Sequence, residues 1–223
     1  MRFARDNSLS IFFLAIFLIS LAGQAIAGHG ASNHDQLLHH GDPISLGRYL
    51  TTSQFAADVA ENWQSEYLQF TLYIFGTVWL LQRGSPESKP LDRAGLESDE
   101  DQRVGTHAGP RSPGWARAGG LRTALYGNSL LIVMTTIWLG SWLAQSIAGA
   151  SGYNADQLDH QAATVSWFNY LGSSDFWSRT LQNWQSEFLA VGSMAVLSIY
   201  LRQRGSPESK PVGALHESTG VEG

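Results

Sequence analysis

The sequence contains a long internal repeat. Residues 7–90 align without a gap on residues 128–211, a shift of 121 positions, and 37 of the 84 aligned pairs are identical. A gapless match of this length means that both copies adopt the same local fold. Each copy holds two apolar segments, a polar stretch between them and a polar tail. This pattern predicts two helical hairpins in tandem.

The composition excludes several classes of protein. Only 15% of the 223 residues are charged, against about 25% in typical soluble domains. The net charge of −5 leaves no basic surface for nucleic acid. The absence of cysteine excludes disulfides, thiolate metal sites and thiol nucleophiles. Neither a phosphate-binding glycine loop nor an HExxH pattern nor a nucleophile elbow occurs, so we expect no enzyme activity and no cofactor.

Two apolar segments are long enough to cross a bilayer. Residues 9–27 and 130–149 contain no charge, and about 20 helical residues cover a hydrocarbon core of about 30 Å. Residues 63–82 and 184–202 are less apolar, but each segment begins at a Trp and has an Arg at its other end. These residue types anchor helices at the two membrane interfaces. The alternative for the latter two segments is a pair of helices lying at the interface.

The sequence therefore predicts an all-α integral membrane protein with four transmembrane helices, arranged as two tandem parallel-repeat helical hairpins with long outer-face loops. The first hairpin covers residues 1–90, with its outer loop at 28–62. The second hairpin covers residues 123–211, with its outer loop at 150–183. We expect a flexible linker at 91–122 and a tail at 212–223. Thr52 and Ser173 have the residue types of N-caps, so we expect each second span to end a helix of about 30 residues.

The basic residues predict the orientation of the hairpins. Of 14 Lys and Arg, only Arg48 and Arg179 lie in the two loops inside the copies. By the positive-inside rule, the N-terminus, the linker and the C-terminus are cytoplasmic and the acidic loops are outside. We expect a multi-pass membrane protein, with the lipid bilayer as the partner. A second copy of the chain is a further candidate partner, and no small-molecule ligand is indicated.

The first apolar segment has a second interpretation, as a cleaved signal peptide. Arg2 and Arg5 precede it, and Ala25-Ile26-Ala27 has the small-x-small form of a cleavage site. In the second copy Ser146-Ile147-Ala148 occupies the same place, where no cleavage signal is needed. We therefore expect both segments to be membrane helices.

Each copy carries the block Asn-Trp-Gln-Ser-Glu at the outer end of its second span. The candidate interface residues are Asn62, Trp63, Gln64, Glu66, Asn183, Trp184, Gln185 and Glu187. Asn and Glu are four residues apart and share a helix face, and an ionisable group at this depth needs a partner. We interpret the residues as a hydrogen-bonded girdle that locks each hairpin. The alternative is a shared polar site for ions or protons.

Two other groups of residues have a structural and a functional interpretation. Ser20 with Gln24, and Ser141 with Gln145, form stripes at helical spacing that are typical of helix packing in lipid.

The outer loops hold the second group, and its weak metal candidates are His39, His160, Asp35 and Asp156. Imidazole and carboxylate can bind zinc, copper or nickel, but the spacing matches no established site. We expect solvated loops, with metal binding as the alternative.

The paired NWQSE and QRGSPESKP blocks, with GQAIAG at 23–28, resemble a family of small bacterial predicted membrane proteins known only as a domain of unknown function. The resemblance covers nearly the whole chain and implies a bacterial four-span protein, without activity, cofactor or catalytic residue. We expect a structural or interaction protein of the bacterial envelope. The alternatives are a small ion, proton or solute channel or transporter that uses Glu66 and Glu187, and metal binding at the outer face.

Overall fold

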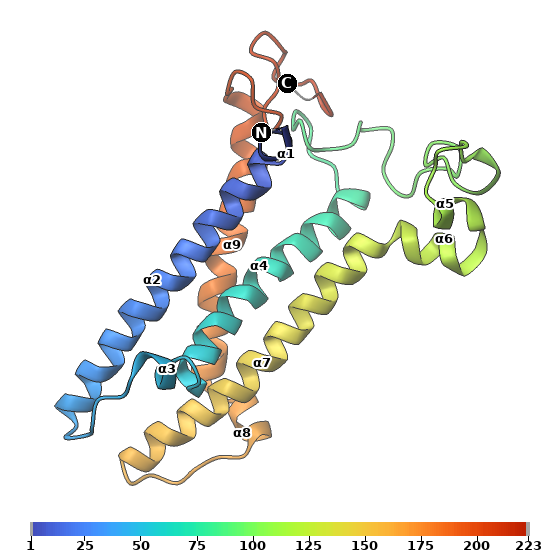
Figure 1. Cartoon of the computed structure of the whole chain (residues 1–223). Coiled ribbons are helices and arrows are strands. Elements are labelled where there is room, and N and C mark those ends of the chain that lie inside the picture. Colours follow the sequence, from blue (N-terminus) through green and yellow to red (C-terminus); the bar gives the residue numbers. More distant parts are fainter. Residues whose placement is uncertain (1, 222–223) are drawn as a thin grey trace. The chain divides into compact units, whose positions relative to one another are not determined.

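The computed structural model describes residues 2–221, and within this range every regular element is a helix, as predicted (Figure 1). The long helices are α2 (Ser8–Leu38), α4 (Ser53–Trp79), α7 (Ser129–Asp159) and α9 (Ser174–Tyr200). The short helices are α1 (Arg2–Asp6), α3 (Leu46–Tyr49), η1 (Gly105–His107), α5 (Gly114–Ala118), α6 (Gly120–Gly127) and α8 (Trp167–Leu171).

The long helices of the two sequence copies have matching boundaries. α2 and α7 contain 31 residues each, and α4 and α9 contain 27 each. Their first residues differ by 129 − 8 = 121 and 174 − 53 = 121, which is the shift that aligns the sequences. Helix length is therefore the same in both copies although fewer than half of their residues are identical.

α2 and α7 are the helices of the described range that are long and apolar enough to cross a membrane. No residue is buried in the most apolar stretch of α2, and 17% of the residues are buried in that of α7. α4 and α9 do not reach the same apolar character. Of the four predicted spans, those in α2 and α7 therefore meet this criterion within the described residues.

The described residues form two compact units. One contains the residues up to Val59 together with Ala144–Asn169, and the other contains Ala60–Leu143 together with the residues from Tyr170 onward. α4 and α7 each contribute residues to both units. All of α2, the first residues of α4 and the second half of α7 are in the first unit. Most of α4, the first half of α7 and all of α9 are in the second.

The first long helix of each copy extends well beyond its apolar segment. α2 continues past residue 27 to Leu38 and α7 continues past residue 149 to Asp159, and the residues that follow each apolar segment include glycines but no proline. Both helices end on a residue with left-handed backbone, His40 at φ 59° and Gln161 at φ 56°. The next amide donates back to the carbonyl five residues earlier, at 2.7 Å in both copies. This pattern is a Schellman motif, which satisfies helix-terminal carbonyls.

The predicted N-caps are present at both second helices. Thr52 Oγ1 accepts a 3.2 Å hydrogen bond from the Phe55 amide at the start of α4, and Ser173 Oγ accepts one of 3.2 Å from Phe176 at the start of α9. The linker, predicted to be flexible, contains η1, α5 and the start of α6. α6 ends at Gly127, directly before α7.

Candidate functional site

The contact between α4 and α9 is a ladder of three polar pairs, and both helix segments belong to the second unit (Figure 1). Arg179 donates to Glu61 at 3.4 Å, the Trp184 indole donates to Gln64 Oε1 at 2.8 Å, and the Ser65 hydroxyl donates to Glu187 at 3.5 Å. Residue numbers rise together along both helices, so the helices run parallel. We call these six residues the α4–α9 ladder.

The centre of the ladder is buried and its edges are not. Gln64 is 0% exposed and Ser65 is 1% exposed, whereas Trp184 and Glu187 are half-buried. Glu66 is exposed, and its charge acts on Glu187. The twinned glutamates therefore have different surroundings, because only Glu187 receives the Ser65 hydroxyl.

The contacts of Asn183 and Asn62 differ from the predicted pairing of Asn with Glu on one helix face. Asn183 Nδ2 donates to the backbone carbonyl of Arg179 at 2.9 Å. Ser65 donates to the carbonyl of Asn62 at 2.9 Å in addition to its contact with Glu187. Gln185, the counterpart of Gln64, is exposed. The structure thus brings Gln64, Trp184 and Glu187 into the ladder and leaves Asn62 and Gln185 outside it.

Arg179 is the functional residue that the motif analysis missed. Its guanidinium pairs with Glu61 at 3.4 Å and lies 3.7 Å from Asp175. Asp175 in turn accepts a 3.1 Å hydrogen bond from the Tyr170 hydroxyl. Burial and the Asp175 charge both raise the pKa of Tyr170. The sequence signal was the isolation of Arg179 among acidic loop residues, since a lone cation there needs carboxylate partners.

An aromatic cluster continues the contact between α7 and α9. The Trp142 ring lies 6.0 Å from Trp138, 6.2 Å from Phe176, 6.1 Å from Trp177 and 5.8 Å from Trp184, measured between ring centroids. Aromatic pairs at such distances contribute about 0.5–1.5 kcal/mol each beyond their buried area. Trp184 therefore connects the apolar packing of α7 with the polar contacts of α4.

Tyr49, the counterpart of Tyr170 in the first copy, is buried in the first unit. It is 1% exposed, and its ring centroid lies 5.9 Å from His29 and 5.4 Å from Phe55. A Cβ atom at Gly28 would collide with the Tyr49 hydroxyl. Burial, and after it the Asp58 charge, raise the pKa of Tyr49.

Two asparagines clamp the outer loops. Asn33 Oδ1 accepts from the Ile44 amide at 2.8 Å while its Nδ2 donates to the Ile44 carbonyl at 3.0 Å. Asn154 makes the same pair of bonds to Val165, at 2.8 and 2.9 Å. Each carboxamide therefore takes the place of a backbone hydrogen-bonding partner. This role explains why both copies have Asn at the first position of the repeated Asn-x-Asp-Gln-Leu-x-His pattern.

The outer-loop histidines have different surroundings. His29 Nε2 lies 2.6 Å from the Ile44 carbonyl, so this ring belongs to the loop clamp. His39 and His160, from the two copies, have their ring centroids 6.3 Å apart. Asp35 and Asp156 place their backbone carbonyls against the Nδ1 atoms of these two rings. Among the described residues, no group of three or more His, Asp or Glu side chains is arranged to enclose a metal ion.

The two predicted packing stripes differ in burial. Ser141 and Gln145 are 8% and 2% exposed, whereas Ser20 is exposed and Gln24 is half-buried. The next residue, Ser146, accepts a 3.1 Å hydrogen bond from the Trp167 indole. Ser141, Gln145 and Ser146 of α7 are therefore buried.

The QRGSPESKP block folds into the same loop after α4 and after α9. Ser88 Oγ accepts from the Gln82 amide, and Ser209 Oγ accepts from the Gln203 amide, both at 2.9 Å. Gly84 and Gly205 have φ values of 85° and 80°, which favour glycine. The block is thus a closed turn and a helix stop, as its composition indicates.

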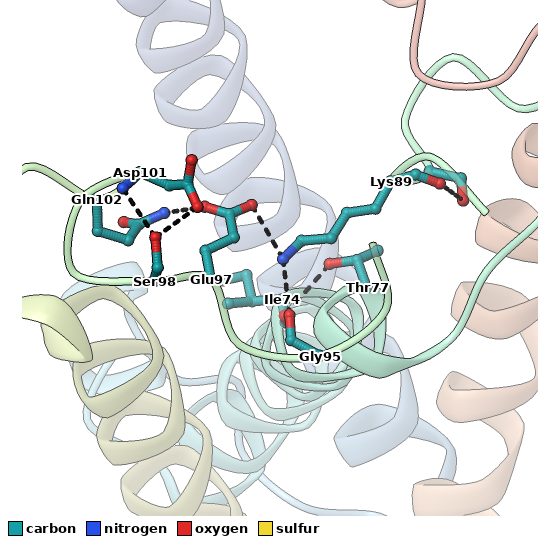
Figure 2. A network of polar contacts seen from close by, with 9 residues as sticks. Ile74, Thr77, Lys89, Gly95, Glu97, Ser98, Asp101 and Gln102 are labelled. Carbon is teal, nitrogen blue, oxygen red and sulfur yellow. Dashed lines mark hydrogen bonds and ion pairs between the residues drawn. The ribbon is translucent and has the colours of Figure 1, made fainter. Parts of the chain in front are cut away.

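The lysine of the first block fixes the start of the linker (Figure 2). Lys89 Nζ donates to the Gly95 carbonyl at 3.0 Å and pairs with Glu97 at 3.1 Å. Hydrogen bonds from Lys89 and Gln102 lower the pKa of Glu97. The Gly95 amide donates to the Val78 carbonyl at 2.8 Å, so the linker satisfies one of the last carbonyls of α4.

The lysine of the second block is buried. Lys210 is 1% exposed, and its Nζ lies 2.6 Å from the carbonyl oxygen of Gly84, 3.2 Å from that of Leu215, 2.8 Å from that of His216 and 3.3 Å from that of Ser218. Burial lowers the pKa of Lys210, and the Arg202 charge lowers it further. The ammonium of Lys210 therefore ties the C-terminal tail to the first block.

A groove of about 300 Å³ lies between the later turns of α4 and α9. Its walls include Leu72, Leu80 and Phe188, and its far end is formed by residues of the first QRGSPESKP block. Gln69 Oε1 also lines this region, buried and with no hydrogen-bond partner in the described range. The groove suits an apolar chain that ends in a hydrogen-bond donor.

Comparison with known proteins gives one match. The model of a family described as Domain of unknown function (DUF6766) matches residues 1–221. No curated protein and no solved structure matches the chain.

Proposed function

This chain belongs to the DUF6766 family, and we propose that it is a structural or interaction protein of the bacterial cytoplasmic membrane. In this proposal the chain has four spans in two tandem hairpins, with both termini in the cytoplasm. The spans are residues 9–27, 63–82, 130–149 and 184–202.

The unburied apolar surface of α2 supports a membrane location. None of its most apolar residues is buried, and residues 11–20 are all exposed. At about 25 cal/mol per Å² of apolar surface, leaving such a helix in water would cost many kcal/mol. α7, which has the same length and lies far from the N-terminus, makes a signal peptide a poor explanation for the pair. α4 and α9 contain the two less apolar spans except for their last residues, because these helices end at Trp79 and Tyr200.

The α4–α9 ladder is the observation that carries the structural role. The Gln64 carbonyl oxygen accepts from the Trp184 indole at 2.8 Å, while the Gln64 amide nitrogen is buried without a hydrogen-bond partner among the described residues. The Ser65 hydroxyl is shared between the Asn62 carbonyl at 2.9 Å and Glu187 at 3.5 Å. In a poorly hydrated setting, paired polar groups stabilise a helix contact and leave little open for a passing ion. The ladder therefore suits a rigid seam between two hairpins.

A channel or transporter is the second candidate, and one observation favours it. Glu66 is exposed and its charge acts on Glu187, so two carboxylates lie near each other at the same level of parallel helices. Pairs of this kind inside membranes often mark ion or proton paths. A charge-removing substitution separates the two functions.

The membrane topology is testable because the chain has no cysteine of its own. Single cysteines at Gly41 and Ala162 should react with a membrane-impermeant maleimide added to intact spheroplasts. Cysteines at Gly105 and Gly220 should react only after lysis. Labelling of Gly105 from outside, or protection of both Gly41 and Ala162, would contradict the four-span arrangement.

The role of the seam is testable with Glu187. We expect Glu187→Gln to retain folded yield, because an amide still accepts from Ser65, and Glu187→Ala to lose about 1–3 kcal/mol of stability. Glu66→Ala is the matched control and should be tolerated, since Glu66 is exposed. Proton or cation flux in liposomes that disappears in a well-folded Glu66→Gln/Glu187→Gln variant would favour the channel instead.

A further inference from the structure

The ends of α2 and α7 place one histidine from each copy side by side. The ring centroids of His39 and His160 are 6.3 Å apart, at an interplanar angle of 69°. Both residues belong to the first compact unit, so the contact lies within one body. They occupy equivalent positions of the repeat, whereas His34 and His40 are replaced in the second copy by Ala155 and Gln161.

Both rings are oriented in the same way by the backbone. His39 Nδ1 lies 3.0 Å from the Asp35 carbonyl oxygen, and His160 Nδ1 lies 2.7 Å from the Asp156 carbonyl oxygen. A ring that donates from Nδ1 to a carbonyl leaves the lone pair of Nε2 available for a ligand. Histidines that bind metals usually have this second partner, because it fixes the tautomer and the direction of the ring.

The distance between the rings fits one bridging metal ion. A metal–nitrogen bond is about 2.0–2.1 Å, and the centroid of an imidazole ring lies about 1.2 Å behind its nitrogen. Two imidazoles on opposite sides of one ion therefore have centroids at most about 6.5 Å apart. The observed 6.3 Å suits such an opposite pair in a square-planar site and is too long for a tetrahedral one.

We propose that His39 and His160 bind one transition metal ion between them through their Nε2 atoms, with water in the remaining coordination positions. Imidazole nitrogen is a ligand for Cu²⁺, Ni²⁺ and Zn²⁺, and the general order of affinities puts Cu²⁺ first. The Asp35 carboxylate lies 3.5 Å from His39 Nδ1 and adds negative charge beside the site. The bound ion would join the outer ends of the two copies.

The first test is a Cu²⁺ titration of the full chain in nanodiscs, purified with a tag that contains no histidine. We expect one ion per chain, with the electron paramagnetic resonance signature of imidazole nitrogen. His39→Asn and His160→Asn should each weaken binding by at least about tenfold. His34→Asn and His40→Asn are matched controls that should leave the affinity unchanged. Equal affinity in all four variants would overturn the proposal.

The second test uses the wild-type chain, so it does not depend on the folding of a variant. Ni²⁺ should protect His39 and His160 from carbethoxylation by diethyl pyrocarbonate, measured residue by residue with mass spectrometry. His34 in α2 and His107 in η1 should react equally with and without Ni²⁺. Protection of neither His39 nor His160, or equal protection of all four histidines, would overturn the proposal.

Discussion

The indole nitrogen of Trp184 donates a 2.8 Å hydrogen bond to Oε1 of Gln64, a side chain that is 0% exposed. The donor comes from α9 and the acceptor from α4, at positions that the repeat does not make equivalent. The counterpart of Gln64 is Gln185, which is exposed. Of these two glutamines at equivalent positions, Gln64 is thus the one whose side chain is buried.

Gln64→Leu should destabilise the protein by about 1–3 kcal/mol, because the Trp184 indole loses its acceptor in a buried place. Gln185→Leu is the matched control and should change stability by no more than about 0.5 kcal/mol, since its side chain is exposed. Denaturation in mild detergent, followed by tryptophan fluorescence, measures both values. Equal losses in the two variants would contradict the buried contact.

Asn33→Ala and Asn154→Ala should each lower the melting temperature, because each removes two hydrogen bonds to the outer loop. Together these bonds should contribute about 1–3 kcal/mol. Asn33→Asp should lose less, since a carboxylate still accepts from the Ile44 amide. The control His34→Ala changes an exposed side chain. Equal melting temperatures for Asn33→Ala and His34→Ala would contradict the prediction.

Gly28→Ala and Gly30→Ala should have opposite effects although both lie in α2. A Cβ atom at Gly28 collides with the buried Tyr49 hydroxyl, and such overpacking costs about 1–3 kcal/mol. A Cβ atom at Gly30 meets no atom within 4 Å, so alanine there should gain about 0.5–1 kcal/mol from helix propensity. Thermal unfolding of the two variants checks the sign, and stabilisation by Gly28→Ala would be the contrary result.

Lys210→Met should release the C-terminal tail, because it removes the ammonium that contacts four backbone carbonyls. Limited proteolysis should then cut residues 211–221 faster than in wild type. Lys89→Met is the matched change in the first copy and should leave the tail protected, since Lys89 contacts Gly95 and Glu97 instead. Equal cutting of both variants would show that the buried lysine does not hold the tail.

Stability should fall as the pH rises above about 10, and Tyr49 and Tyr170 should contribute to the fall. Their pKa values are raised in the folded protein, mainly by burial. The folded state therefore keeps protons that the unfolded state releases from about pH 10 upward, which favours unfolding. Below that pH both states hold the protons and the contribution is constant.

Absorbance at 295 nm checks the ionisation of Tyr170. Wild type and Tyr170→Phe should give the same titration between about pH 9 and 11 when folded, and should differ by one tyrosine when unfolded in denaturant. A difference of one tyrosine in the folded state within this range would contradict the raised pKa.

The sequence predicts the helical architecture well because its signals are local. Thr52 and Ser173 are N-caps by residue type, and each bonds the third amide of its helix. The ends of α2 and α7 could not be placed from the sequence, because apolar character stops near residue 27 while helix formation continues until a Schellman turn. In the second copy that turn uses Gln161, a residue type with no preference for left-handed backbone, so composition gives no signal there.

The candidate site was only partly predictable, because sequence repeats cannot show how symmetry is broken. Identical residues at equivalent positions suggest identical roles, yet Glu187 bonds Ser65 while Glu66 is exposed. Likewise, a lysine beside a proline in a polar tail is expected in solvent, and Lys210 is 1% exposed. Such differences arise from tertiary contacts, which a single sequence does not contain.

The Glu61–Arg179 pair has a consequence for how the two halves stay together. In the alignment Arg179 corresponds to Asp58, and Glu61 corresponds to Gln182. Two separate identical chains could not place an acid on one side of their seam and a base on the other at these positions. Fusion into one polypeptide permits this asymmetry and makes association intramolecular, at an effective concentration of the order of mM. The pairing of the halves is therefore insensitive to dilution and to expression level, unlike that of a homodimer.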